Sequence, residues 1–81
     1  MKLFLISQSQ NHDYDSYDSA VVAASNDKTA RQMNPATGEP ITDWENPFST
    51  WCNDPKYVTV RYLGEAVDVE QGVICASFNA G

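Results

Sequence analysis

The apolar positions of this chain fall into four short runs, each with the length and composition of a β-strand. The first two are apolar on both faces, which is typical of strands inside a sheet. The third alternates, with Val58, Val60 and Tyr62 on one face and Arg61 on the other. The runs are residues 3–6, 20–24, 57–63 and 72–78. We expect the first to pair with the second, and the third and fourth to form a hairpin with a long loop.

A capped segment typical of a short helix follows the second run. Asn26 and Asp27 can accept hydrogen bonds from the free N–H groups of a first helical turn. Ala30 and Met33 would form the stripe that faces the sheet, and the residue before Pro35 ends the helix because proline disfavours a helical residue ahead of it. The sequence therefore predicts a helix of two or three turns that is stabilised by packing on the sheet.

All four prolines lie within residues 34–55, which excludes a long regular element there. A short helical turn is expected at residues 47–52, with Asn46 capping and Pro47 at the first helical position. Large apolar side chains predict that this long loop packs against the domain rather than being disordered. They are Ile41, Trp44, Phe48 and Trp51.

The order β-β-α-β-β predicts a small α+β fold: a mainly antiparallel sheet of about four strands, one short helix on a face, and the long Pro-rich loop. The 81 residues, of which 42% are apolar, are enough for one small core. We therefore assign residues 1–81 to a single domain.

The formal net charge of −6, with only five Lys and Arg, disfavours direct binding to nucleic-acid phosphates. An acidic protein more naturally meets a basic surface. The apolar run at residues 3–6 is too short for a signal peptide or a membrane span. We expect a cytoplasmic protein that does not bind membranes.

The sequence holds no recognisable catalytic motif. Cys52 and Cys75 are too far apart for a CxxC motif, and both are expected to be reduced and mostly buried. His12 is the only histidine, and nothing in the sequence places it beside either thiol. We expect a protein that is not an enzyme and needs no cofactor.

The link between the first two strands, residues 9–18, is rich in aspartate and predicts an exposed loop. With His12 its aspartates loosely match the start of a calcium loop, but the required glycine and closing glutamate are missing, so no metal site is predicted. The link can be interpreted as a recognition surface for a basic partner, because it combines rigid aromatic rings with negative charge. The alternative interpretation is a solvated turn without a binding role. The candidate partner-binding residues here are Asp13, Tyr14, Asp15, Tyr17 and Asp18.

The Pro-rich loop offers a second candidate surface. Trp44 and Trp51 could flank a groove, with Asp43 and Glu45 on its rim, and we include Trp44, Glu45 and Trp51 among the candidate partner-binding residues. The alternative, in a chain this small, is that the two indoles fill the core under the loop. The sequence leaves both readings open.

The chain contains the segments KLFLISQ, YDSYDSAVVAAS, STWC, YVTVRYLGEA and GVICASFNAG. Together they resemble a set of small uncharacterised accessory proteins encoded by phages, prophages and bacteria. The resemblance covers most of the chain, outside residues 34–46, and implies no catalytic residues. It implies a context, because phage accessory proteins of this size often bind and block a host protein, including components of antiviral defence.

Three functions follow as hypotheses. The leading one is a non-enzymatic binding protein that inhibits or modulates a host protein, such as an antiviral-defence component, through its acidic, aromatic-bearing surface. The alternative is a nucleotide-like small-ligand binding or sequestering protein, in which Trp44, Trp51 and Tyr62 stack on a flat molecule, with more than one subunit in the assembly. The third is a homodimer through the last strand, if that strand is an uncovered edge.

Overall fold

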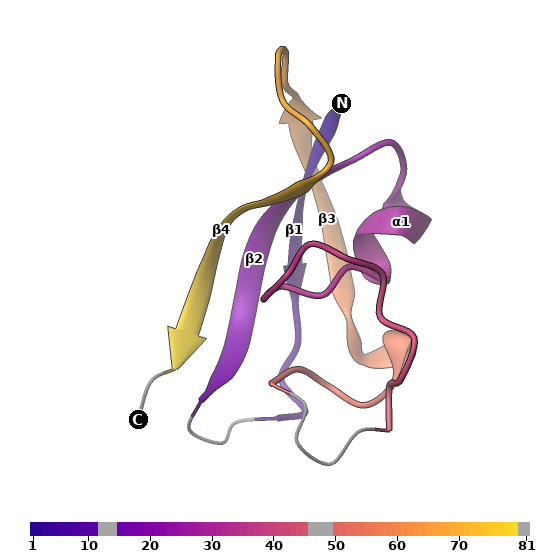
Figure 1. The fold of residues 1–81 in the computed structure, drawn as a ribbon, viewed down its shortest axis with the longest axis vertical. Helices are drawn as coiled ribbons and strands as arrows, with labels where there is room; N and C mark the ends of the chain where they lie inside the picture. The colour runs from indigo at the N-terminus through magenta and orange to yellow at the C-terminus, as the bar shows by residue number, and fades with distance from the viewer. Residues whose placement is uncertain (12–14, 46–49, 80–81) are drawn as a thin grey trace.

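The computed structural model describes residues 1–11, 15–45 and 50–79, and it confirms the α+β fold. The sheet has four antiparallel strands in the order β3-β1-β2-β4, with a short helix, α1, on one face (Figure 1). A single 3₁₀ turn, η1, precedes the third strand. The elements are β1 (Lys2–Ser7), β2 (Ser16–Ala24), α1 (Asp27–Arg31), η1 (Pro55–Tyr57), β3 (Thr59–Glu65) and β4 (Gly72–Asn79).

The two strands that are apolar on both faces, β1 and β2, occupy the centre of the sheet and pair with each other, as expected. The expected hairpin of β3 and β4 is wrong, because these strands form the two opposite edges. The link between them, residues 66–71, crosses one end of the sheet, where the chain also begins (Figure 1). A hydrogen bond of 2.9 Å from the Ala66 N–H to the Met1 carbonyl ties the link to the first residue.

Helix α1 begins as the sequence predicts and ends earlier. The side chain of Asn26 caps it by accepting a hydrogen bond of 2.8 Å from the Thr29 N–H. The helix ends at Arg31, so the expectation of two or three turns is wrong. The chain instead turns so that Met33 forms an isolated bridge with Pro40. Ala30 and Met33 are both buried, as predicted.

The core lies between the sheet and the layer formed by α1 and the Pro-rich loop. Val58 is buried and Val60 packs against the core, while Thr59 and Arg61 are exposed, which confirms the register expected for this segment. The strand itself starts later than expected, because residues 55–57 form η1. Tyr62 is 54% exposed at the edge and meets the Phe4 ring edge-on at 5.8 Å.

The Pro-rich loop packs against the core, as expected. Trp51 is only 3% exposed, and Ile41 and Trp44 are partly buried against the same core. The expected helical turn falls partly on residues 46–49, which lie outside the described residues, and residues 50–52 are not helical. The same capping chemistry appears at η1, where the Asp54 carboxylate accepts from the Lys56 N–H at 2.9 Å and Pro55 takes the first position.

The sheet face away from α1 carries a row of side chains that is apolar except for Arg61 at one end, beside a row of hydroxyls. Each row runs across all four strands, and its members share a face because they are partners in the antiparallel pairing. The second row lies two residues along each strand from the first. The first row is Arg61, Leu5, Val21 and Cys75, and the second is Thr59, Ser7, Ser19 and Ser77. In the described part of the chain, no helix is long and apolar enough to span a membrane.

Candidate functional site

The predicted acidic, aromatic surface maps to the end of the sheet where β2 begins. Asp13 and Tyr14 lie outside the described residues. Asp15 is exposed, and its backbone is in the left-handed region with φ of 63°, a conformation that aspartate tolerates better than most residues. Asp18 is also exposed, at a bulge in the pairing of β2 with β4. We call Asp15, Tyr17 and Asp18 the acidic corner.

Tyr17 is the aromatic centre of the acidic corner. Its ring is half-buried and lies against the Phe78 ring of β4, with the ring centroids 4.8 Å apart and an interplanar angle of 55°. Its N–H donates to the Thr50 carbonyl at 2.8 Å, which holds the start of β2 against the end of the Pro-rich loop. A ring supported in this way offers rigid contact area at little entropic cost.

Gln8 organises the link that leads into the acidic corner, although nothing in the sequence singled it out. Its Nε2 donates to the Asn11 carbonyl at 2.9 Å and to the Tyr17 carbonyl at 2.8 Å. Its Oε1 accepts from the Gln10 and Asn11 N–H groups at 2.9 and 2.8 Å. The amide thus makes all four of its hydrogen bonds, while the side chain is only 8% exposed.

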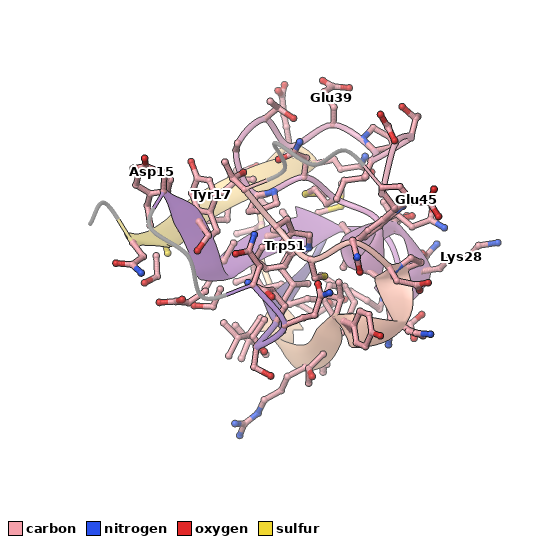
Figure 2. All side chains as sticks on the ribbon, turned by 90° about the horizontal axis from the view of Figure 1, so that it is seen from below. Asp15, Tyr17, Lys28, Glu39, Glu45 and Trp51 are labelled. Atoms are coloured by element: carbon pink, nitrogen blue, oxygen red, sulfur yellow. The ribbon has the colours of Figure 1, made fainter. Side chains whose placement is uncertain are left out.

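The same link is joined to the Pro-rich loop. The Asn11 side-chain amide donates to the Trp51 carbonyl at 3.1 Å, and the Asn53 N–H donates to the Gln10 side chain at 3.1 Å. The two candidate surfaces of the sequence are therefore neighbours in the fold, and Figure 2 shows Trp51 between Tyr17 and Glu45 in that view.

Of the loop candidates, Trp51 belongs to the core. Its 3% exposure corrects its assignment as a partner-binding residue, because a buried indole cannot meet a partner in this fold. Trp44 is half-buried and packs against the core, and Asp43 and Glu45 are exposed. The indole of Trp51 therefore fills the core, whereas the carboxylate of Glu45 adds negative charge to the surface.

The residues of the small-ligand hypothesis are not gathered at one described hollow. Tyr62 lines a shallow hollow of about 310 Å³, and neither tryptophan lines it. The other residues around the hollow belong to β1 and to the start of α1. They include one cation, Lys2, one carboxylate, Asp27, and a second aromatic ring, Phe4. They are Lys2, Phe4, Asn26 and Asp27.

The five Lys and Arg residues all lie away from β2 and β4. None lies in β2 or β4, and Figure 2 shows Lys28 on the opposite side of the molecule from Asp15 and Tyr17. Arg31 already donates to the Pro55 carbonyl at 3.2 Å and to the Val58 carbonyl, and Lys2 pairs with Glu65 at 3.7 Å. The cations are in β1, α1, η1 and β3: Lys2, Lys28, Arg31, Lys56 and Arg61. The carboxylates of the acidic corner thus have no basic residue on their own strand or on β4.

The thiols differ from the expectation that both are mostly buried. Cys52 is buried, but Cys75 is exposed on the edge strand β4, which corrects the prediction for that residue. Burial raises the pKa of the Cys52 thiol, which also contacts the Asp54 carbonyl at 3.5 Å. A buried thiol with a raised pKa stays protonated and is a poor nucleophile.

Within the described residues, no group of three or more His, Cys, Asp or Glu side chains could hold a metal ion. His12 and Asp13 of the calcium-like segment lie outside those residues. Comparisons of the chain with protein-family models, with curated proteins and with solved structures found no match. The functional argument therefore starts from the geometry of the acidic corner.

Proposed function

We propose that this protein is a non-enzymatic binding protein whose acidic corner docks on a basic surface of another protein. The observation that carries the proposal is the exposure of two carboxylates, Asp15 and Asp18, close in sequence to the Tyr17 ring that packs on Phe78. They lie in the half of the sheet formed by β2 and β4, and neither of these strands carries Lys or Arg. Aromatic anchors and complementary charge are the usual sources of affinity and steering at protein interfaces.

The chemistry of this surface defines the partner. Two carboxylates beside a tyrosine match arginine best, because guanidinium binds carboxylates through two hydrogen bonds and stacks on aromatic rings. The net charge of −6 would also speed the encounter with a basic partner. In the context implied by the resemblance to phage accessory proteins, that partner is a host protein, such as a component of antiviral defence, and binding inhibits or modulates it.

The experiment separates the acidic corner from the overall charge. The variant Asp15→Asn/Asp18→Asn removes two carboxylates from the corner, and asparagine also tolerates the positive φ of residue 15. The control, Asp68→Asn/Glu70→Gln, removes two carboxylates from the β3–β4 link, and Asp68 likewise has a positive φ, of 59°. Both variants therefore have the same net charge.

A pull-down from bacterial lysate with the wild type identifies partners, and their affinities for the purified variants are then measured by titration. We expect the corner variant to bind at least about tenfold more weakly, as the loss of two charged contacts implies, and the control to stay within about twofold of the wild type. Equal weakening by both variants would show that only the overall charge matters and would refute the proposal.

A further inference from the structure

The sheet has two edges, and they differ in how they are protected. Edge strands have backbone N–H and C=O groups that no neighbour satisfies, and natural proteins protect such edges with charge, proline or bulges. β3 carries Arg61 and Glu65, its pairing with β1 is interrupted by a bulge, and Glu65 is held by Lys2. Another chain would therefore have to displace charged groups to pair with β3.

β4 lacks most of this protection. Its eight residues, GVICASFN, include no charged residue and no proline. Ile74 is 50% exposed and Phe78 is 44% exposed, although both lie in a strand. Its pairing with β2 has two bulges, one at Ile74, since Val73 and Cys75 pair with adjacent residues of β2, and one at Asp18 of β2. Irregular pairing is therefore the one form of protection that this edge has. Residues 75–78 thus form an edge without charge or proline.

The apolar row on the sheet face away from α1 points to the same edge. Leu5 and Val21 lie in the middle of this row, and the exposed Cys75 is its last member, at the outer side of the sheet. A strand added beside β4 would continue the row and cover Cys75. The opposite end of the row is Arg61, on β3, where a continuation would be charged.

We infer that β4 pairs with β4 of a second copy of this chain, antiparallel and about a two-fold axis, to give one continuous eight-stranded sheet. A second copy fits because the edge is uncharged, so like charges do not face each other in the pairing. A two-fold axis sets identical residues opposite each other. Centred on Ala76, it brings Ile74 of each copy beside Phe78 of the other, and each exposed apolar side chain gains an apolar neighbour.

This arrangement leaves the acidic corner free, because Asp15, Tyr17 and Asp18 precede or belong to β2, one strand inside the new interface. The two corners of the dimer would lie at opposite ends of the joined strands, since the strands run antiparallel. The inference rests on the edge and not on the proposed function, so either can fail without the other.

The test compares two lysine substitutions in one cross-strand row. Ser77 and Thr59 are both exposed members of the hydroxyl row, one on β4 and the other on β3. Ser77→Lys places charge at the proposed interface, and Thr59→Lys makes the same change in net charge at the opposite edge. Circular dichroism confirms that each variant is folded.

Sedimentation equilibrium over about a hundredfold range of concentration should show the wild type and Thr59→Lys passing from one chain to two, because self-association follows mass action. Ser77→Lys should stay at the mass of one chain. Hydrogen exchange of the wild type adds a test that needs no variant: within residues 75–78, the amides that point away from β2 should become protected as concentration rises. A wild type that remains monomeric, a dimer without this protection, or equal disruption by both variants would each overturn the inference.

Discussion

Burial separates the two thiols of this chain. Cys52 is 1% exposed and belongs to the same buried cluster as Trp51 and Val58. Cys75, in contrast, is exposed on β4. The raised pKa of Cys52 has burial as its main cause, opposed by backbone hydrogen bonds and reinforced by the nearby Asp54 carboxylate. Thiol reagents should therefore modify Cys75 and leave Cys52 untouched in the folded monomer.

The same pKa shift predicts how stability changes at alkaline pH. Below the ordinary thiol pKa of about 8.5, folded and unfolded states both hold the Cys52 proton, and stability is unaffected. Above it the unfolded thiol ionises first, so the free energy of unfolding falls as pH rises through the folded pKa. Urea melts between about pH 7 and 10 measure this decline. Cys52→Ala should decline less steeply over that range, and a slope equal to that of the wild type would contradict the assignment.

Single residues were predictable where their partners are close in sequence. The cap at Asn26 follows from local chemistry, because the N–H group that it binds lies three residues later. Gln8 shows the opposite case. Its amide joins carbonyls and N–H groups of a link whose path is set by the tertiary fold, and its contact with Tyr17 spans nine residues. A glutamine after a strand gives no local signal of such a role.

Among the elements, β3 gives the sharpest test of register. Val60→Asp would place a carboxylate against the core, where it costs about 2–4 kcal/mol, a large part of the stability of a small domain. Arg61→Asp, one position along on the exposed face, should cost about 0.5 kcal/mol or less. Thermal melts of the two variants measure both effects. The reverse order of stability would mean that the strand is shifted by one residue.

The strands and the central place of β1 and β2 followed from hydrophobic patterning, but the neighbours and the exposure of the outer strands did not. The hairpin expected for β3 and β4 rested on their adjacency in sequence. In the fold, β1 and β2 are the strands that need cover on both faces, so they take the centre and the outer strands are separated. The length of the helix was also overestimated, because a contact distant from the helix in sequence intervenes. The Met33–Pro40 bridge and the turn before it end α1 at Arg31.

The candidate site was predictable in its charge and only partly in its geometry. Acidic and aromatic residues in one link indicated a surface, and Asp15 and Asp18 are indeed exposed. The support of Tyr17 by Phe78 could not be foreseen, because it depends on β4 lying next to β2. The sequence could not decide the place of Trp51 either, since burial of an indole depends on how the long loop folds back.

For the whole molecule, net charge acts in opposite directions on the two associations that we propose. Docking of the acidic corner on a basic partner is attractive at long range, so added salt should screen it and weaken binding. Pairing of two copies brings together two chains of charge −6, so the same salt should screen a repulsion and strengthen the dimer. The short-range contacts at β4 are uncharged, and salt leaves them largely unchanged.

Raising sodium chloride from about 0.05 to 0.5 M, which shortens the screening length about threefold, should therefore raise the dissociation constant of the partner complex and lower that of the dimer. Titration against the captured partner gives the first constant, and sedimentation gives the second. Asp68→Asn/Glu70→Gln, with less charge to repel, should dimerise more tightly at low salt and approach the wild type at high salt. If salt weakens both associations, charge attracts the two copies as well, and pairing through the uncharged β4 edge is not what joins them.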